Sequence, residues 1–577
     1  MRSSLLMVTS RYSLFSRFMV TASHCAGLLL ASSIALAQDA PANGTEAVEQ
    51  PAPSDGAPSV AAPVDPWTQL PLGLNPTAVI DLAIEQGWRD HDLQPAAPAS
   101  ESTFCRRVHL DLIGRVPRAS EVEAFLSDTD SRKRENLVDR LLSSQEHAAH
   151  LAEVLDAVLI GRTEQKDFKR RTDAGWFDYL TRAVAENRPW NQVAREIVLA
   201  RPRDSAERGA SWYLYARKDK AQDMAEAVSK DIFGVRIDCA QCHDHPLASE
   251  IEQKHYWGLV AFFNRSKNVD TRNGPRVSES AIGGFSDFAN LQGQAQPNEL
   301  VYLGERQVAE PRPAKDAKEE DRDDLYTPGE TDEPRVPKFS RREQFVEVVL
   351  KDHPLLASAM VNRLWGWMFG RGLVHPVDNL DSFHPASHPG LLDWLSRDFA
   401  ASGYNVRRLL RSLALARAYQ LSSDKDSFVD PQWFSIGLAK PLTAEMLQRS
   451  LLMVLDPEDA GQWNSLEQRI AFARLFPDVL SEESLATVAQ GLLLTNGPSI
   501  NQLASPQHSR LLRNLRSVSD NRQLIERLFQ SILGRGADEA ELQKCDAFLS
   551  ERADRRERAM SDLAWALVTS AEFRFNH

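Results

Sequence analysis

A cysteine pair followed by a histidine is the most reactive pattern in this chain of 577 residues. Two residues separate Cys239 from Cys242, and His243 follows directly. This C-x-x-C-H spacing is typical of covalent haem c attachment, because two such thiols can add to the two vinyl groups of one porphyrin. The adjoining imidazole then reaches the iron. The pattern therefore predicts one haem c on Cys239 and Cys242, with His243 as its first axial ligand.

Two other interpretations use the same residues. Cys239, Cys242 and His243 or His245 offer the sulfur and nitrogen ligands that zinc prefers, and two cysteines at this spacing form half of a zinc site. Alternatively, the two thiols form a disulfide, and the histidines only pack or cap. Haem c, zinc and no cofactor all remain open from the residues alone.

A haem that carries electrons usually has a second axial ligand, methionine or histidine. His245 is too close in sequence to reach the opposite face of the same haem. The histidines that remain as candidates are His255, His375, His384 and His388. A haem with a single protein ligand fits the sequence equally well.

A loop rich in histidine and aspartate forms a second group of candidates. His375 precedes Asp378 and Asp381, and two His-Pro pairs follow at His384 and His388. These side chains could bind a metal or hydrolyse an extracellular polymer. His-Pro pairs also commonly form turns, which favours a structural role. The chain has no Gly-rich phosphate loop and no convincing nucleophile–base pair.

Residues 1–37 have the pattern of an export signal. Three arginines and no acidic residue precede an apolar run from Phe18 to Leu36, and small residues at Ala35 and Ala37 offer a cleavage site. The run is interrupted by polar residues and is short for a permanent membrane span. We therefore expect a periplasmic or otherwise exported protein with no permanent membrane span. Haem c is attached outside the cytoplasm, so this expectation favours the haem interpretation.

The composition limits the classes of partner that we expect. The formal net charge is −13, which is unfavourable for nucleic acid, whose affinity comes mostly from cationic contacts to phosphate. Five cysteines in 577 residues are too few for a disulfide-based scaffold. We expect exported redox proteins or envelope proteins as partners.

The spacing of apolar residues predicts a mainly α-helical, multi-helical chain. We expect an N-terminal helical domain with the motif at 75–265 and a C-terminal helical domain at 341–577. An irregular, acidic and partly disordered segment, with a small strand or two, should join them at 266–340. Residues 38–70 are rich in alanine and proline and should form a disordered spacer.

Two helices have clear limits in the sequence. The stretch from Lys133 to Leu142 places its leucines on one face. The stretch from Pro354 to Phe369 begins with proline and should end at Gly370.

One pattern occurs twice. Residues 107–115 match residues 527–535, and a glutamate follows each stretch at the same distance, Glu121 and Glu541. Each stretch predicts a helix that ends at its Gly-Arg pair and leads into a helical hairpin. We interpret the Gly-Arg pairs as helix ends with a structural arginine.

Several motifs together resemble two paired domains of exported planctomycete proteins. Residues 104–117 and 236–246 look like the second planctomycete cytochrome-type domain. The motifs that resemble planctomycete-specific domain one lie at residues 360–378, 388–395, 418–422 and 441–445. These domains are of unknown function, and the cytochrome label reflects the Cys-Ala-Gln-Cys-His motif. Many relatives carry a separate cytochrome-like domain ahead of the pair, where this chain has its spacer. The resemblance implies an exported protein and leaves the role of the motif open.

Overall fold

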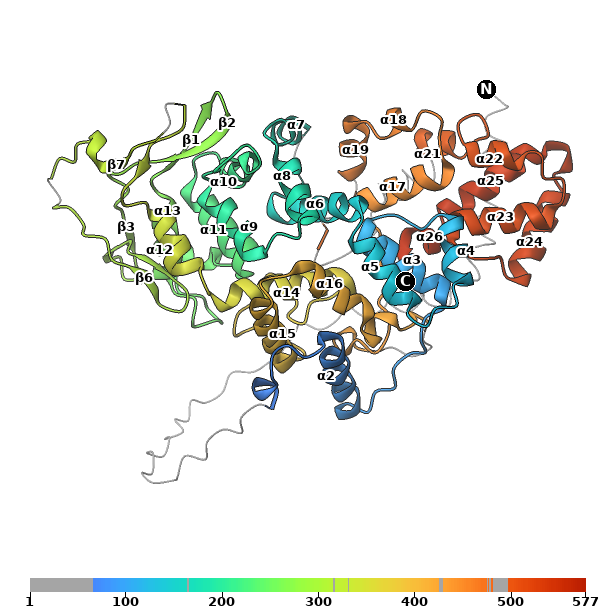
Figure 1. The fold of residues 1–577 in the computed structure, drawn as a ribbon, viewed down its shortest axis with the longest axis horizontal. Coiled ribbons are helices and arrows are strands. Elements are labelled where there is room, and N and C mark those ends of the chain that lie inside the picture. The colour runs from blue at the N-terminus through green and yellow to red at the C-terminus, as the bar shows by residue number, and fades with distance from the viewer. Residues whose placement is uncertain are drawn as a thin grey trace, which may run out of the picture. The chain divides into compact units, whose positions relative to one another are not determined.

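Helices make up most of the described chain, as the sequence predicts (Figure 1). The computed structural model describes residues 66–162, 165–314, 317–329, 332–424, 429–474, 476, 479–480 and 497–577. The predicted export signal and residues 38–65 of the predicted spacer lie outside this part of the chain.

The elements before the strands are mostly α-helices with short 3₁₀ turns between them. They are η1 (Pro66–Gln69), α2 (Pro76–Asp90), α3 (Glu101–Ile113), α4 (Ala119–Ser127), α5 (Lys133–Leu142), α6 (Gln145–Leu159), α7 (Gln165–Asp173), α8 (Trp176–Ala185), α9 (Trp190–Leu199), η2 (Arg208–Ser211), α10 (Trp212–Tyr215), α11 (Ala221–Phe233), η3 (Asp238–Gln241) and α12 (Gln253–Phe263).

The predicted connecting segment contains more regular structure than expected, four two-stranded antiparallel pairs and a 3₁₀ turn. They are β1 (Ser266–Thr271) with β2 (Gly274–Glu279), β3 (Asp287–Ala289) with β4 (Ala295–Pro297), β5 (Leu300–Tyr302) with β6 (Arg306–Val308), η4 (Asp323–Leu325), and β7 (Tyr326–Thr327) with β8 (Val336–Pro337). Buried residues of β5 pack against α12, so the segment joins the core instead of forming a solvated loop.

The rest of the chain is again helical, apart from one short strand pair. Its elements are α13 (Arg341–Gln344), the π-turn η5 (Phe345–Leu350), α14 (Pro354–Phe369), α15 (Pro389–Ala401), α16 (Val406–Leu415), η6 (Arg417–Gln420), η7 (Pro431–Trp433), β9 (Lys440–Pro441), α17 (Ala444–Leu455), α18 (Ala460–Trp463), α19 (Leu466–Ala473), α21 (Pro498–Leu503), α22 (Arg510–Leu515), α23 (Asn521–Leu533), α24 (Glu539–Ser550), η8 (Ala553–Arg555), α25 (Arg556–Val568), α26 (Ala571–Arg574) and β10 (Phe575–Asn576), which pairs with β9.

Helix limits follow local rules. The Ser100 side chain caps α3 by accepting from the Thr103 amide at 3.1 Å, and α3 ends at Gly114, whose φ of +70° suits glycine. The predicted helix from Pro354 to Phe369 is confirmed as α14. It ends at Gly370 in the same left-handed conformation, with a φ of +81°. These ends set where the following loops begin.

Helix α14 lies at the centre of the packing, against α11, α15 and α16. Arg363 on α14 donates to the carbonyl oxygens of Asp231 at 2.9 Å and Lys230 at 3.2 Å, near the end of α11. The Lys230 carbonyl also accepts from the Gly234 amide at 2.9 Å, and the guanidinium caps these last carbonyls of α11. Because α11 and α14 belong to the two predicted domains, both regions share one core. The division into two helical domains is not confirmed, since residues 65–577 form one unit.

Part of the predicted spacer is folded. Pro66–Gln69 form the 3₁₀ turn η1 against α15, and the Arg397 guanidinium donates to the Trp67 carbonyl oxygen at 3.1 Å. The predicted spacer, residues 38–70, therefore ends in a short ordered stretch.

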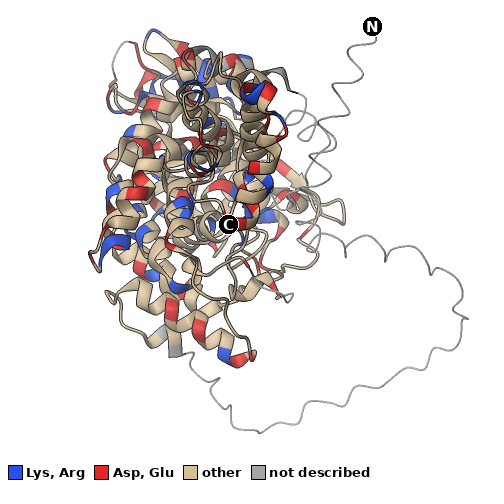
Figure 2. Cartoon of the chain, turned by 90° about the vertical axis from the view of Figure 1, so that its right-hand side faces the viewer, with Lys and Arg blue, Asp and Glu red and all other residues tan. Residues whose placement is uncertain are grey.

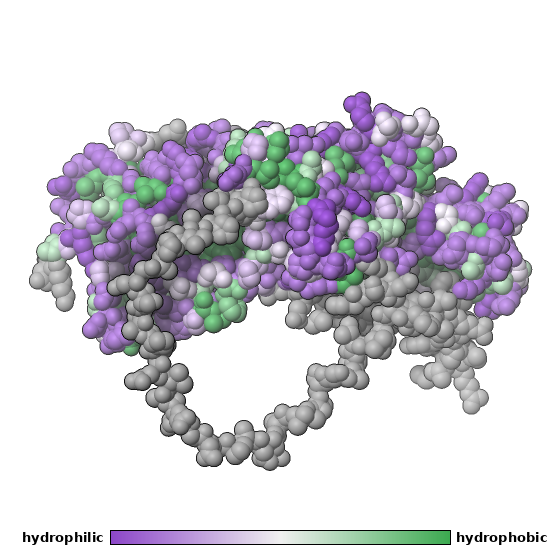
Figure 3. All heavy atoms as spheres, turned by 90° about the horizontal axis from the view of Figure 1, so that it is seen from below, coloured by the Kyte–Doolittle hydropathy of each residue, from purple (hydrophilic) through white to green (hydrophobic). Residues whose placement is uncertain are grey.

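Charged residues of both signs are interspersed over the helices in Figure 2. Hydrophilic residues cover much of the face in Figure 3, with smaller apolar areas between them. Across the described residues, none of the helices combines the length and the apolar character needed to cross a membrane.

Candidate functional site

The cysteine motif lies on a short turn at the surface. The chain leaves α11 at Gly234 and enters η3, which contains Cys239, and Cys242 directly follows that turn. Both side chains are exposed and neither cysteine is in a disulfide. Ala240, between them, is fully buried and fixes the turn to the core. The two thiols therefore face solvent from a well-anchored segment.

Side chains of α12 form hydrogen bonds to the turn and fix its position. The Gln241 carbonyl oxygen accepts from Trp257 Nε1 at 3.1 Å and from Gln253 Nε2 at 3.3 Å. The Asp244 carboxylate accepts from the Gln253 amide at 2.8 Å, at the start of α12, where a negative charge is favourable. The motif and α12 are thus a single packed unit.

The two histidines of the motif differ in their contacts. His243 Nδ1 lies 2.8 Å from the Asp244 carbonyl oxygen, which can only accept, so Nδ1 carries the hydrogen and Nε2 keeps a lone pair. His245 Nδ1 accepts from the amides of Leu247 at 3.2 Å and Ala248 at 2.9 Å, so its lone pair on Nδ1 is already used. Of the two, His243 has the tautomer of a metal-binding imidazole held by its other nitrogen.

The loop after the motif contacts the histidine-rich loop of the C-terminal region. Glu250 accepts from the Ser382 amide at 2.6 Å and from the Ser382 hydroxyl at 2.7 Å. Two residues on, His384 Nδ1 lies 2.8 Å from the Asp381 carboxylate, which fixes Nδ1 as the donor. The sequence did not predict that these two candidate groups would be neighbours.

Large apolar side chains are exposed on the segments around the motif. Leu247 is 57% exposed on the loop after it, Phe383 is 50% exposed next to Ser382, and Leu291 is 71% exposed on the β3–β4 hairpin. That hairpin is tied to the motif, because Gln253 Nε2 also donates to the Ala289 carbonyl oxygen at 3.0 Å. Three of the nine exposed large apolar side chains among the described residues thus lie on segments that contact the motif or the loop after it.

A cavity of about 900 Å³ reaches the motif from the side of α11. Arg236 and Asp238, which precede Cys239, line it, together with the aromatic side chains of Trp212 and Tyr215. Its other lining residues are mostly charged, with both signs present. The cavity is therefore a polar space beside the motif and not an apolar pocket for a macrocycle.

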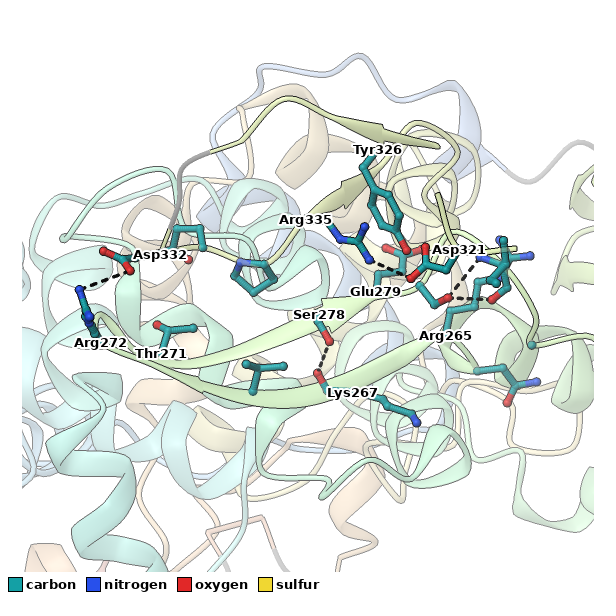
Figure 4. Close-up of a pocket in the computed structure, with 17 residues that line it drawn as sticks. Arg265, Lys267, Thr271, Arg272, Ser278, Glu279, Asp321, Tyr326, Asp332 and Arg335 are labelled. Carbon is teal, nitrogen blue, oxygen red and sulfur yellow. Dashed lines mark hydrogen bonds and ion pairs between the residues drawn. The ribbon is translucent and has the colours of Figure 1, made fainter. Parts of the chain in front are cut away.

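A second cavity, of about 700 Å³, lies at the β1–β2 hairpin (Figure 4). Its charged side chains pair with one another, Arg272 with Asp332 at 3.7 Å and Arg335 with Asp321 at 2.8 Å. This arrangement forms salt bridges between chain segments and leaves no evident nucleophile with its base among the lining residues.

The weaker candidates of the histidine-rich loop are in separate places. Asp378 pairs with Arg363 at 2.6 Å. His388 is buried beside Trp433 and Phe434, and burial lowers its pKa to about 4. His375 lies in the loop before them, at the cis bond to Pro376. The structure brings His384 and Asp381 together, but not the predicted group as a whole.

One metal-compatible group was missed by sequence reasoning. Among the described residues, Glu252, His255 and Glu305 have ligand atoms within 4.8 Å of one another. The Lys254 ammonium already lies 3.3 Å from Glu252 and 3.0 Å from Glu305, so the two carboxylates have a cation between them. Glu252 and His255 are three apart at a helix start, which the sequence shows. Glu305 is 50 residues from His255, and nothing local indicated it.

Comparison with protein families identifies the two halves of this arrangement. A family model described as PSCyt2, protein of unknown function (DUF1549), matches residues 79–268, which contain the cysteine motif. A second, described as PSD1, protein of unknown function (DUF1553), matches residues 341–468. The chain contains a PSCyt2 region followed by a PSD1 region. The PSCyt2 region supplies α11, η3 and α12, and the PSD1 region supplies α14 and the histidine-rich loop. No curated protein and no solved structure matches the chain.

Proposed function

We propose that this is an exported protein that carries one haem c on Cys239 and Cys242, with His243 as axial ligand, for electron transfer or other redox chemistry. The observation that carries the proposal is the His243 contact to the Asp244 carbonyl oxygen, beside two exposed thiols. A bound haem would supply a one-electron couple. The chain would supply the thioether links, the axial nitrogen and the surroundings.

The exposed apolar side chains around the turn support this proposal. A porphyrin is a flat apolar ligand, and the side chains of Leu247, Phe383 and Leu291 offer apolar surface next to the attachment residues. The polar cavity lined by Arg236 and Asp238 lies beside the motif and suits the charged groups of a partner better than the ring.

The zinc interpretation has less support. His245 uses its Nδ1 lone pair on two amides, which leaves three candidate ligands at the motif. Structural zinc needs four, in a closed tetrahedral shell. A Cys239–Cys242 disulfide in a non-redox envelope protein is the remaining alternative, favoured by the exposure and proximity in sequence of the two free thiols.

His384 is our candidate for the second axial ligand. Its segment contacts the loop after the motif through Ser382 and Glu250, and the Asp381 carboxylate on Nδ1 makes Nε2 the basic nitrogen. Nε2 has one long contact, 3.4 Å to Asn379 Nδ2, which a haem iron would have to displace. His384→Ala should convert a low-spin haem spectrum into a high-spin one. The matched control is His388→Ala, because the His388 ring is buried and packs against Trp433. Identical spectra for wild type and His384→Ala would exclude His384 as a ligand.

The deciding experiment is an intact mass and an absorption spectrum of protein exported from a host that matures c-type cytochromes. We expect the mass of one haem in addition to the chain, a reduced α-band, and loss of both in Cys242→Ala. Cys545→Ala is the control, because Cys545 is a buried cysteine outside the motif. A bare mass would overturn the proposal: two hydrogens fewer would indicate the disulfide, and stoichiometric zinc by elemental analysis would indicate a structural metal site.

A further inference from the structure

A lysine, an asparagine and an aspartate meet in the core at the junction of α3, α14 and the β9–β10 pair. Asp111 on α3 has a side chain that is 1% exposed. Its Oδ1 accepts from Lys440 Nζ at 2.8 Å and from Asn576 Nδ2 at 2.8 Å. The amine and the amide are therefore neighbours across one carboxylate oxygen. No motif in the sequence indicated this group.

The strand register places the lysine and the asparagine directly opposite each other. Lys440 and Asn576 are partners in the antiparallel β9–β10 ladder. Side chains at such positions lie on the same face, with Cβ atoms about 4.5–5.5 Å apart. A lysine side chain is long enough to bring its nitrogen to the side-chain carbonyl carbon of a residue at that distance. The fold thus holds an amine and a primary amide in reach of each other.

From this geometry we propose that Lys440 and Asn576 join in an isopeptide bond, with Asp111 transferring the protons. Lys440 Nζ attacks the Asn576 side-chain carbonyl carbon, and Asp111 takes a proton from the attacking amine. Asp111 returns a proton to Nδ2, the bond from that carbon to Nδ2 breaks, and ammonia leaves. An amine and a primary amide become a secondary amide and ammonia, so atoms balance and no oxidant or other reactant is needed.

Burial favours the reactive, uncharged form of the amine. It lowers the pKa of Lys440, against the opposing charge of Asp111. Besides Asp111, Nζ contacts the carbonyl oxygens of Trp367 at 2.6 Å and Met368 at 2.9 Å. These three acceptors match the three hydrogens of the ammonium, and transfer of one proton to Asp111 leaves a neutral amine with a free lone pair.

Two further contacts fit the roles of the carboxylate and the leaving group. The Tyr419 hydroxyl donates to Asp111 Oδ2 at 2.7 Å, which holds the carboxylate so that Oδ1 faces both nitrogens. Asn576 Oδ1 is buried and has no hydrogen-bond partner within the described residues, so the amide is not locked in its present form. Lys440 and Asn576 line a cavity of about 10 Å³, close to the space that one water-sized molecule needs.

A tryptic peptide map of the wild-type, full-length protein tests the proposal. Trypsin does not cut before proline, so Lys440 lies in peptide 426–449 and Asn576 in peptide 575–577. We expect a branched species with the summed mass of the two less one ammonia, and depletion of free 426–449. Intact mass alone is insufficient, because an N-terminal Gln38, left by cleavage after Ala37, also loses ammonia on cyclisation. Finding only the two separate peptides in wild type would overturn the proposal.

Variants assign the roles. Lys440→Arg and Asp111→Asn should each abolish the branched species. Asn576→Asp should still give the same linked product, now by loss of water. Asp393→Asn, an exposed aspartate of α15 paired with Arg397, is the control and should link as wild type does. Complete linkage in Asp111→Asn would overturn the role of Asp111. The wild-type map stands even if a variant does not fold, and it is independent of haem.

Discussion

Solvent reaches the Cys239 turn but hardly reaches the Asp111 carboxylate, although both regions bring reactive side chains together. At the turn, two thiols and an imidazole lie open on the surface, fixed from below by α12. At the cluster, a carboxylate that is 1% exposed is enclosed by Lys440, Tyr419 and Asn576. Open groups can react with a molecule that arrives from outside, whereas enclosed groups can react only with one another. This difference underlies our two proposals, a cofactor at the first region and a crosslink at the second.

Exposed and buried groups should differ most in the reactivity of their cysteine thiols. Cys105 and Cys545 are buried, and burial raises the pKa of each thiol to about 12, from an ordinary value of 9.0. Three pKa units leave about a thousandfold less reactive thiolate, before any shielding is counted. In haem-free protein, the exposed Cys239 and Cys242 should therefore be alkylated far faster than Cys105 and Cys545, measured by mass spectrometry over time. Equal rates would contradict the burial difference.

Removal of the enclosed carboxylate should cost far more stability than removal of an exposed one. Asp111→Ala leaves the Lys440 ammonium and the Tyr419 hydroxyl without their acceptor, so we expect a loss of about 3–5 kcal/mol in urea unfolding. Asp244→Ala removes only a contact at the start of α12, so about 1 kcal/mol or less should be lost. Similar losses for the two variants would show that the Asp111 cluster is not a closed unit.

The sequence predicted the open region and missed the enclosed one for a physical reason. The Cys239–His243 motif and the ends of α3 and α14 are set by neighbours within a few residues, so local patterns suffice. Asp111 meets Lys440 across 329 positions and Asn576 across 465, and only tertiary packing brings them together. The strand pairs of 266–340 were underestimated likewise, because most are two or three residues long and pack on elements outside the segment, as β5 does on α12 and β2 on α10.

For zinc, sequence reasoning could not rank the two histidines of the open region. As zinc ligands His243 and His245 were equal candidates, and only the carbonyl of Asp244 and the amides at 247 and 248 distinguish their nitrogens. The Glu250–Ser382 contact, which brings the histidine-rich loop to the motif, joins residues 132 positions apart.

Acid should destabilise the interior through its histidines. Burial lowers the pKa of His109 and of His147 to about 4, so both stay neutral in the fold while the unfolded chain takes up protons below about 6.5. Their contribution is complete above pH 6.5 and is lost as the pH falls towards 4, by roughly 2–3 kcal/mol each at pH 4.5. Chemical unfolding at a series of pH values measures this slope, which His109→Phe should flatten.

A separate acid step should follow at lower pH. Burial alone would raise the pKa of Glu121, but the hydrogen bonds from Arg115 hold it down to about 2. That stabilisation is present above the ordinary value of 4.5 and is lost as the pH falls through 2. Glu121 stays charged between pH 6.5 and 4.5, so an unchanged slope over this range in His109→Phe would contradict the role of His109.

The two Gly-Arg pairs give the finest test of burial, because their contacts are alike. Arg115 binds Glu121 and Glu146 through four hydrogen bonds of 2.7–3.0 Å, and Arg535 binds Glu541 and Glu572 through four of 2.6–2.8 Å. The side chain of Arg115 is 3% exposed and that of Arg535 is 31% exposed.

Because the hydrogen bonds of the two arginines are alike, the exposure of each arginine to solvent should determine how much stability is lost when it is replaced. Arg115→Met should lose about 3 kcal/mol, because water cannot readily take the place of a guanidinium that is 3% exposed, and Arg535→Met about 1 kcal/mol, because water can replace the guanidinium. Urea unfolding of the two variants measures the difference, and added salt should reduce only the smaller loss. If both variants lost the same stability, the hydrogen-bond pattern and not its burial would determine the contribution, and the distinction drawn between open and enclosed groups would fail at its simplest case.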